Sequence, residues 1–534
     1  MTPPPSPGRW VPFVGAVLFA AAHTQPPLYY SNQNQYFLHG LAAAGYGDLG
    51  RDWLANTADP TPAFSALVEV AYRALGEWPF HAAFVVLLVV YFLSLWGVVA
   101  ALPFRPVTTA GRAALAAGLI VVHAGIVRAA SVWLVGVDYP WYFQAGVANQ
   151  YLLGAGLQPS VFGVLLLSSL AAFANGRPVA AGLLAAAACA MHSTYLLPAG
   201  MLVAGMILGL WRAGRTRAAV ATGAVALAGV APVLAYTLAV FAPTDPARFA
   251  EAQAILAWVR IPHHTVVSRW LDWVAALQLL WLAAGVAAFR RTPLFVPLAV
   301  AAGGALALTI VQLLTDGATL ALLFPWRVSA VLVPIATGAA LAGLARLAER
   351  TTPSRWLLIV SGLLAITAAA GAGVVYAQRL GYQETAAEAE LLRRVAADRK
   401  PGEVYLLPAD FPDPPTGRGS ASSSFVPVRP SDRPAIFELM RFRLGTGAAA
   451  YVDFKSIPYR DDEVLEWHHR VANAARWYAT EDWDASGALA EVTAEGVTHV
   501  VVPAGLDVTS RRLKPVSDGT AYRVYRVEPT ASGE

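Results

Sequence analysis

The sequence predicts a polytopic α-helical membrane protein with about eleven transmembrane helices, followed by a smaller α/β domain. Two observations favour this fold class. Of the 534 residues, 57% are hydrophobic and only 13% are charged, a composition that soluble globular domains rarely have. Most acidic residues and all three lysines lie after about residue 380. We therefore expect a transmembrane domain over residues 1–380 and a soluble domain over residues 381–534.

Apolar runs that are long enough, or nearly long enough, to cross a hydrocarbon layer of about 30 Å recur through the first domain. Several are shorter than a typical span, and the stretch 178–211 is the hardest to divide. The first run also has the basic start and the small final residues of a signal peptide, and we expect it to be retained. The runs lie near residues 10–23, 82–102, 109–127, 159–174, 178–191, 195–211, 217–242, 271–289, 293–314, 328–346 and 356–377.

The basic residues between these runs predict an orientation. If the N-terminus is cytoplasmic, most arginines of the short loops fall on the inner side, which is the positive-inside pattern. The loop 24–80 and the C-terminal domain are then extracytoplasmic. The inner arginines are Arg9, Arg105, Arg112, Arg177, Arg212, Arg215, Arg217, Arg290, Arg291, Arg346, Arg350 and Arg355.

The first outer loop, residues 24–80, is the most informative stretch of the chain. It begins with a helical period that places Asn32, Gln35 and His39 on one side and apolar residues on the other, as in a helix lying flat on a lipid surface. Two glycines interrupt this period, and a second helical run covers residues 63–75. Between the two runs lie three carboxylates, Asp48, Asp52 and Asp59.

After residue 380, short strands alternate with helices. This pattern predicts a small, mostly parallel α/β domain with both faces of the sheet covered. A loop rich in Pro, Ser and Gly interrupts it at residues 410–430. Strands are expected at 404–407, 449–454, 499–503 and 521–528, and helices at 384–399, 434–444, 462–478 and 485–495.

Several classes of function find no support in the sequence. It contains no P-loop, and Gly445-Thr446-Gly447 precedes a strand rather than a helix, so it is no dinucleotide-binding loop. No basic tract indicates a nucleic-acid partner. The single cysteine, Cys189, provides neither a disulfide framework nor a thiol-rich metal site.

The three carboxylates of the first loop are candidates for a general base. A carboxylate at the outer membrane face can take the proton of an acceptor hydroxyl while that hydroxyl attacks a sugar. Asp52 and Asp59 are placed best for this role, with Asp48 behind them. The alternative for Asp52 is a helix cap or a surface acid. The alternative for Asp59, which precedes a proline, is a turn residue.

Four basic side chains of two later outer loops are candidates for binding a phosphate: Arg260, His263, His264 and Arg327. Arginine binds phosphate through two parallel hydrogen bonds, and a protonated histidine adds charge. The histidines and an outer aspartate could instead hold a divalent metal such as Mg or Mn. The alternatives are histidines solvated by lipid headgroups and an arginine that reaches the membrane surface from the start of a span.

Further polar residues on the same side are predicted to bind substrate. Lys455 follows the end of a strand, where open α/β sheets bind ligands. His192 lies between two spans, and its alternative role is that of a hydrogen-bonded packing residue. The predicted set is Asn32, Gln33, Asn34, Gln35, His39, Asp138, Gln150, His192 and Lys455.

Three stretches of the first loop carry a resemblance: Gln33-Asn34-Gln35-Tyr36, Arg51-Asp52-Trp53-Leu54 and Asp59-Pro60-Thr61-Pro62. Together they resemble the first loop of the GT-C superfamily, membrane glycosyltransferases that use polyprenyl-phosphate sugars. The branch of protein mannosyltransferases and lipid A aminoarabinose transferases is the most similar, also in span number and outer soluble tail. Its catalytic acid usually stands where this chain has Gln33-Asn34. The resemblance therefore implies a base moved to Asp52 or Asp59, or a protein that binds without transferring.

The resemblance implies a GT-C-like glycosyltransferase of the bacterial cytoplasmic membrane. It would move a sugar from a polyprenyl-phosphate donor to an extracytoplasmic glycan, lipid or protein. A polysaccharide polymerase or ligase acting on lipid-linked oligosaccharide is an alternative that shares the arginines and needs no aspartate. A transporter or a non-catalytic envelope scaffold is another, although the sequence lacks the internal repeat of many transporters. The C-terminal domain, with Asp453-Phe454-Lys455-Ser456 and residues 463–470, resembles domains of uncharacterised bacterial membrane proteins.

Overall fold

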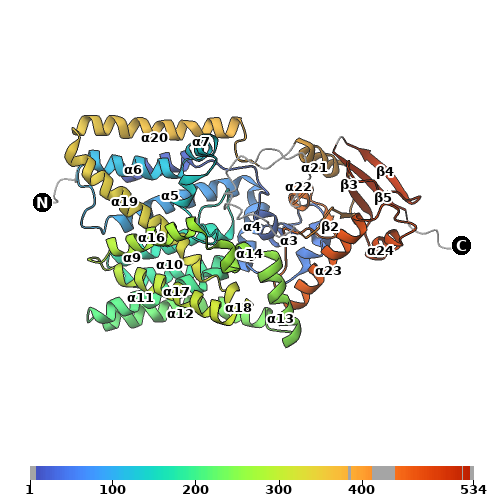
Figure 1. Cartoon of the computed structure of the whole chain (residues 1–534), viewed down its shortest axis with the longest axis horizontal. Helices are drawn as coiled ribbons and strands as arrows, with labels where there is room; N and C mark the ends of the chain where they lie inside the picture. The colour runs from blue at the N-terminus through green and yellow to red at the C-terminus, as the bar shows by residue number, and fades with distance from the viewer. Residues whose placement is uncertain (1–7, 383–385, 412–438, 520, 529–534) are drawn as a thin grey trace.

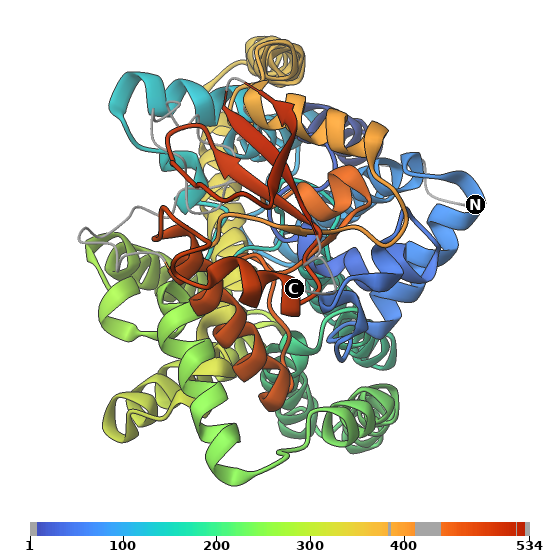
Figure 2. The ribbon, with the colours of Figure 1, turned by 90° about the vertical axis from the view of Figure 1, so that its right-hand side faces the viewer.

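The computed structural model describes residues 8–382, 386–411, 439–519 and 521–528. The chain is mostly helical. Apolar helices form a bundle on the left of Figure 1, and a small sheet with its helices occupies the right. The C-terminal domain covers one end of the bundle, as the end-on view of Figure 2 shows.

Each predicted apolar run contains at least one helix. A helix needs about 20 consecutive, mostly apolar residues to cross a bilayer, and many helices of the bundle are shorter than that. The bundle consists of α1 (Val11–Ala22), α5 (Trp78–Val99), α6 (Thr109–His123), α7 (Gly125–Val135), α9 (Val164–Ala174), α10 (Pro178–Met191), α11 (Leu196–Arg212), α12 (Thr216–Val240), α16 (Trp273–Ala288), α17 (Phe295–Thr315), α19 (Ser329–Thr351) and α20 (Ser354–Ala377).

Within the described residues, six helical segments are long and apolar enough to span a membrane. A seventh results if α6 and α7, which meet at a bend of 60°, count as one span. The other apolar helices have 10–17 residues. The apolar helices support the prediction of a membrane protein, whereas the number of eleven spans stays a prediction. Leucines such as Leu238 and Leu363 point outward from α12 and α20, as expected of side chains that face lipid rather than water.

The first loop folds into short helices against the bundle: α2 (Gln33–Tyr36), α3 (Leu38–Ala43), η1 (Leu49–Arg51), η2 (Leu54–Asn56) and α4 (Pro62–Leu75). Phe37 and Phe64 are fully buried, with ring centroids 5.5 Å apart. Both predicted helical runs are therefore present, with their apolar sides packed inward. Gly47 has a φ of 62° and its Cα lies against the backbone of Gly447, so a side chain has no room there.

The later loops predicted to be extracytoplasmic add further short helices. They are α8 (Tyr139–Tyr142), η3 (Pro159–Gly163), η4 (Ser193–Tyr195), α13 (Pro246–Ala254), η5 (Ile255–Arg260), α14 (Pro262–Thr265), α15 (Val267–Trp270), α18 (Ala318–Leu322) and η6 (Pro325–Val328). Among them, η5 is a π-helical turn, a distortion that is frequent at functional sites.

The C-terminal domain has a five-stranded sheet of order β2-β1-β3-β5-β4. The pairs of β1 with β2 and β3 are parallel, and the pairs of β5 with β3 and β4 are antiparallel. Its elements are α21 (Ala386–Asp398), β1 (Val404–Leu406), α22 (Phe442–Thr446), β2 (Ala449–Ala450), α23 (Asp461–Tyr478), α24 (Ala488–Ala494), β3 (His499–Pro503), β4 (Leu513–Asp518) and β5 (Tyr522–Val527).

The prediction of a mostly parallel sheet was wrong, because the strand β4 was missed. Pro515 lies inside β4, next to an irregular register, and proline is tolerated in this way only at a sheet edge. The strand predicted at 449–454 is also shorter, since β2 ends at Ala450. The helix predicted at 434–444 begins outside the described residues. Most of the loop predicted at 410–430 also lies outside them.

Candidate functional site

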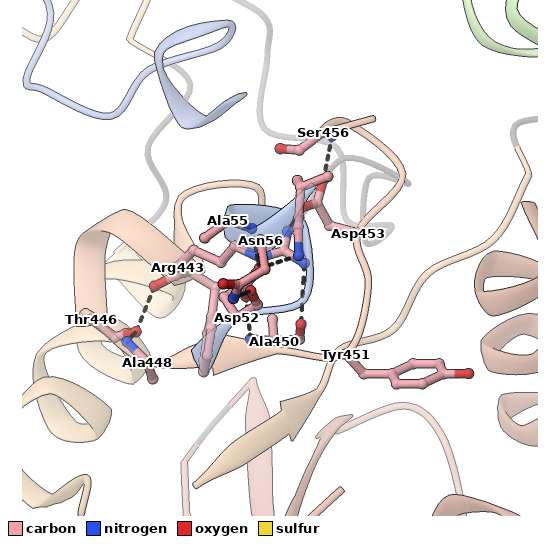
Figure 3. Close-up of polar contacts among 12 residues, drawn as sticks. Asp52, Ala55, Asn56, Arg443, Thr446, Ala448, Ala450, Tyr451, Asp453 and Ser456 are labelled. Atoms are coloured by element: carbon pink, nitrogen blue, oxygen red, sulfur yellow. Dashed lines mark hydrogen bonds and ion pairs between the residues drawn. The ribbon is translucent and has the colours of Figure 1, made fainter. Parts of the chain in front are cut away.

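A buried ion network joins the first loop to the C-terminal domain (Figure 3). Arg443 of α22 donates from Nε to Asp52 Oδ2 at 2.6 Å and from Nη1 to Asp453. The same Asp52 oxygen accepts the Ala450 amide at 2.8 Å, and Asp52 Oδ1 accepts the Leu54 amide at 2.9 Å. Asp52 is fully buried. Both of its oxygens are therefore occupied, and no face of the carboxylate is open to a substrate.

Asp48 also binds the C-terminal domain. Its Oδ2 accepts the amide of Gly402 at 2.6 Å, and its own amide donates to Gly447 O at 2.7 Å. The geometry gives Asp48 and Asp52 the role of docking residues. Of the three acids predicted as general bases, Asp59 is the one whose surroundings leave room for chemistry.

Asp59 lies in a second polar cluster, the acid cluster, with His39, Tyr236 and Glu463. Its Oδ1 accepts the Thr61 amide at 2.8 Å and lies 4.0 Å from His39 Nδ1. The side chain is 20% exposed. The Tyr236 hydroxyl donates to the Asp59 carbonyl at 2.7 Å, which fixes the backbone there. Asp59 thus has an anchored main chain and a carboxylate that solvent reaches.

Glu463 brings a second carboxylate to the acid cluster from α23. It accepts the Ala58 amide at 3.0 Å, next to Asp59 in the chain. Burial raises the pKa of Glu463 above its usual value, although the Ala58 hydrogen bond and Arg460 act in the opposite direction. When two carboxyl groups lie in different environments, their pKa values differ, and one can donate a proton while the other accepts one.

The predicted phosphate-binding residues lie together in what we call the cation cluster: Arg260, His263, His264, Arg327 and Lys455. Arg260 ends the π-helical turn η5 and donates to the carbonyl of Lys455. The histidines lie in α14, and Arg327 lies in η6. Lys455 comes from the loop after β2, so the C-terminal domain completes the cluster.

The charges of these groups act on one another. Burial lowers the pKa of Lys455 to about 7, and the nearby Arg260 lowers it further, whereas Asp453 raises it. Burial also lowers the pKa of His264 to about 4, with Arg327 and Lys455 contributing. His263 is more exposed, at the edge of the cluster, and its pKa is lowered by its partial loss of solvent and then by His264. Both imidazoles are neutral at pH 7.

Several polar atoms of the cluster have no partner within the described structure. They include Nε of Arg260, Nε of Arg327 and Nδ1 of the adjacent His192, all buried. Asp453 is the carboxylate that acts on Arg260 and Lys455, but it is already bound to Arg443. A buried donor without an acceptor costs about 1–3 kcal/mol. An anion placed between these groups would supply both the missing acceptors and the missing charge.

Uncharged groups surround the cation cluster. Arg327 donates to Gln150 Oε1 at 2.9 Å and lies 4.9 Å from the centre of the Tyr195 ring. The rings of Tyr36 and His192 meet edge to face with centroids 5.4 Å apart. The structure therefore brings the predicted Gln150 and His192 to the cluster.

The C-terminal domain reaches the first loop at the same place. Gln35 donates to the Tyr459 hydroxyl at 2.8 Å and to the Ile457 carbonyl at 3.2 Å. The hydroxyl oxygens of Tyr36 and Tyr459 lie 3.5 Å apart. Gln35, also predicted as substrate-binding, thus lies at the edge of the cluster.

The cation cluster and the acid cluster are neighbours. Tyr36 and His39 lie three residues apart in the α2–α3 segment, on the same face of its helical turns. Tyr459 lies just before α23, and Glu463 lies in the first turn of that helix. In both segments the tyrosine faces the cation cluster and the second residue faces Asp59. The two tyrosines therefore form the partition between cations and acids.

Other predicted substrate-binding residues have structural partners. The side chain of Gln33 accepts the Tyr29 amide at 2.7 Å and donates to the Leu157 carbonyl at 2.8 Å. Asn34 donates to the Ser31 carbonyl at 3.0 Å. Asp138 forms a buried ion pair with Arg128 at 2.8 Å. Asn32 precedes α2 and makes no cap hydrogen bond with it. Gln33, Asn34 and Asp138 therefore stabilise the loops around the site.

The possible divalent metal has no evident ligand set. Among residues 8–382, 386–411, 439–519 and 521–528, no group of three or more His, Cys, Asp or Glu side chains is arranged to hold a metal ion. His264 Nδ1 also donates to the Ala148 carbonyl at 2.6 Å, so it is engaged with the backbone. The arrangement fits direct binding of an anion by Arg260, Arg327 and Lys455.

Comparison with known protein families gives a match in the C-terminal domain. Residues 433–474 match a family described as a domain of unknown function (DUF6798). The matched segment includes Arg443, Asp453, Lys455, Tyr459 and Glu463, which connect the C-terminal domain to the clusters described above. No curated protein matches the chain.

Proposed function

We propose that the protein transfers a sugar from a polyprenyl-phosphate donor to an extracytoplasmic acceptor. The observation that carries this proposal is the buried cation cluster, whose neighbouring carboxylate, Asp453, is already bound to Arg443, and which lies where the apolar bundle meets the C-terminal domain. A lipid-linked sugar phosphate matches this place. Its phosphate would lie between Arg260, Arg327 and Lys455, and its isoprenoid chain would follow the apolar outer surface of the bundle.

The proposed reaction uses both clusters. The acceptor oxygen attacks the anomeric carbon and forms a new bond, while the bond from that carbon to the phosphate oxygen breaks with inversion. Asp59 takes the proton of the acceptor hydroxyl. The electron pair of the broken bond stays on the leaving polyprenyl phosphate, whose charge the cation cluster stabilises. The sugar would lie near Tyr36 and Tyr459, between the acids and the cations.

The resemblance to GT-C enzymes supports the same proposal. In that family an outer loop after the first span contributes to the site, and here the first loop contributes Gln35, Tyr36, His39 and Asp59. Gln33, which stands at the family's usual acidic position, binds backbone groups. We place the protein in a bacterial cytoplasmic membrane, with the first loop and the C-terminal domain outside, because of the distribution of arginines.

A ligase or polymerase that acts on lipid-linked oligosaccharide is the second candidate. It would use the same cation cluster and need no carboxylate base. Asp48 and Asp52 bind the C-terminal domain, so only one of the three predicted bases remains for the reaction. A function that needs no carboxylate base therefore stays a candidate. The two functions differ in their dependence on Asp59.

The binding half of the proposal can be tested without knowing the sugar. Replacing Arg260 and Arg327 together by glutamine should raise the dissociation constant for a polyprenyl phosphate about 100-fold or more, because a hydrogen bond to a charged group contributes about 1.5–3 kcal/mol. Binding is measured on the detergent-solubilised protein by native mass spectrometry or fluorescence quenching. Arg248→Gln is the matched control, since Arg248 is an exposed arginine of α13 outside the cluster. Equal affinity of the double variant and this control would refute the proposal.

The pKa of Lys455 gives a second test. The group is protonated below about pH 7 and neutral above it, so it attracts an anion only on the acidic side. Affinity for a polyprenyl phosphodiester, whose charge is constant in this range, should rise about tenfold from pH 8 to pH 6. In Lys455→Met the affinity should be lower at pH 6 and nearly flat with pH. A pH dependence that persists in this variant would assign the titration to another group.

A further inference from the structure

The acid cluster is attached to a helix of the apolar bundle. Tyr236, whose hydroxyl donates to the Asp59 carbonyl at 2.7 Å, belongs to α12, which is long and apolar enough to span a membrane. The helix ends at Val240, so Tyr236 lies about 6 Å before its end at 1.5 Å per residue. Asp59 is therefore held beside the last turns of α12, at the depth where lipid headgroups meet the hydrocarbon layer.

Two exposed apolar helix faces meet at Asp59. The helix α4 begins at Pro62, directly after the turn that contains Asp59, and both α4 and α12 pack on α10. Exposed apolar side chains are stable next to lipid, so these faces form an apolar path from the membrane to Asp59. The exposed residues are Pro62, Ala63, Ala66, Leu67 and Val70 in the first three turns of α4, Ala231, Pro232, Leu234, Ala235, Leu238 and Ala239 in the last three turns of α12, and Val179, Leu183 and Ala187 in α10.

The first turn of α23 joins α12 to the first loop on the side of the C-terminal domain. Asp461 Oδ2 accepts the Thr244 amide at 2.7 Å and the Thr244 hydroxyl at 3.0 Å, just beyond the end of α12. Glu463, two residues later, accepts the Ala58 amide at 3.0 Å. The C-terminal domain thus covers the acid cluster, and the approach that these contacts leave to Asp59 is lateral, between α4 and α12.

The charge of the acid cluster disfavours an anionic lipid. Arg460 binds Asp462 at 2.6 Å and lies 3.4 Å from Glu463. Carboxylates outnumber cations here, so a phosphate in the headgroup would be repelled. An uncharged headgroup meets no such repulsion, and its hydroxyl can donate to Asp59. The charged groups around Asp59 include Asp461, Asp462, Glu463, Arg460 and, when protonated, His39.

We infer that the acceptor is an uncharged membrane lipid with a free hydroxyl close to its glycerol backbone, such as a diacylglycerol. It reaches Asp59 laterally, with its acyl chains along α4 and α12. Its hydroxyl oxygen bonds to the anomeric carbon, the hydroxyl proton passes to Asp59, and the bond from that carbon to the donor phosphate breaks. This inference rests on the sugar-transfer proposal for the role of Asp59, and it adds the class of the acceptor.

The test maps lipid binding on the purified full-length protein. The probe is a diacylglycerol with a photoactivatable diazirine in one acyl chain, and labelled peptides are identified by mass spectrometry. Labelling should concentrate on α4 and on the last three turns of α12. The helix α20, which also exposes leucines such as Leu363, should show background labelling. Unlabelled dioleoylglycerol should compete with the probe, whereas phosphatidylglycerol and phosphatidylcholine should not.

A substitution in the first turn of α4 tests the path. Ala63→Trp should lower labelling about fivefold or more, because the indole would occupy the space that the lipid needs next to Asp59. Ala74→Trp is the matched control, since Ala74 is an exposed alanine at the other end of the same helix. Unchanged affinity for polyprenyl phosphate shows that each variant is folded, and the competition series on the unaltered protein needs neither variant.

The outcomes separate this inference from the sugar-transfer proposal. Labelling that is spread evenly over the exposed apolar helices, or that is equal in Ala63→Trp and Ala74→Trp, overturns the lateral path. Competition by phosphatidylglycerol as strong as that by dioleoylglycerol overturns the uncharged class, and equal competition by a soluble serine-containing peptide overturns the lipid class. All these results leave the donor site intact, because polyprenyl phosphate binding is measured separately. Loss of that binding would refute sugar transfer itself, whichever helices are labelled.

Discussion

Replacing Arg443 by methionine is expected to destabilise the C-terminal domain by about 3–5 kcal/mol. The substitution keeps an apolar stem of similar length but leaves Asp52 and Asp453 buried without their shared cation, and removing one partner of a buried ion pair has this cost. Trp467, Trp477 and Trp483 lie in the core of the domain. Their fluorescence during denaturant unfolding measures the change.

The control for this prediction is Arg476→Met. Arg476 pairs with Glu491 at 2.5 Å, but both side chains are about half exposed, and such pairs contribute about 0–1 kcal/mol. If the two variants unfold at the same denaturant concentration, the network around Arg443 does not hold the domain. Asp52→Asn extends the test. It should lower stability as well, yet keep the rate of transfer per folded molecule, because Asp52 acts in docking.

The bundle could be predicted from the sequence because membrane helices are specified by local composition. Every apolar run produced a helix. The number of spans could not be predicted in the same way, since α9 and α10 are shorter than a bilayer and their placement depends on their neighbours.

Strand β4 was missed for a related reason. Its proline and lysine are atypical of a strand, and only pairing with β5 makes this segment extended.

The site was predicted in part. The cations could be found because Arg260, His263 and Arg327 lie in loops that the arginine distribution of the sequence assigns to one side of the bundle. The partner of Asp52 could not be found, because Arg443 is 391 residues away in the chain. A carboxylate in a loop has the same sequence signal whether it faces solvent or a distant guanidinium. Glu463 was missed as a site residue because its contact with Ala58 forms only when the two domains meet.

His39 lies beside Asp59, the proposed base, and the backbone of the first loop fixes the orientation of its ring. His39 Nε2 lies 3.1 Å from the Thr57 carbonyl and must carry a proton to bond there. Its Nδ1 faces Asp59 at 4.0 Å. The hydrogen bond to Thr57 thus fixes the imidazole ring beside the carboxylate of Asp59.

Replacing Asp59 by asparagine is therefore expected to lower the transfer rate about 10²–10⁴-fold and to leave donor affinity within about twofold. A general base contributes a rate factor of this size, while the donor phosphate binds the separate cation cluster. The rate is measured with saturating donor, and the affinity with the polyprenyl-phosphate assay described above. Asp316→Asn is the control, because Asp316 is an exposed acid with a φ of 47°, a conformation that asparagine adopts readily.

Glu463→Gln decides between the two carboxylates of the acid cluster. If Asp59 is the base, Glu463→Gln should reduce the rate less than Asp59→Asn does, because glutamine can still accept the Ala58 amide and hold the loop in place. A larger loss in Glu463→Gln would transfer the role to Glu463. Full transfer in both single variants and in the double variant would exclude a carboxylate base in this cluster. The cation cluster would then act alone, as expected of a ligase for lipid-linked oligosaccharide.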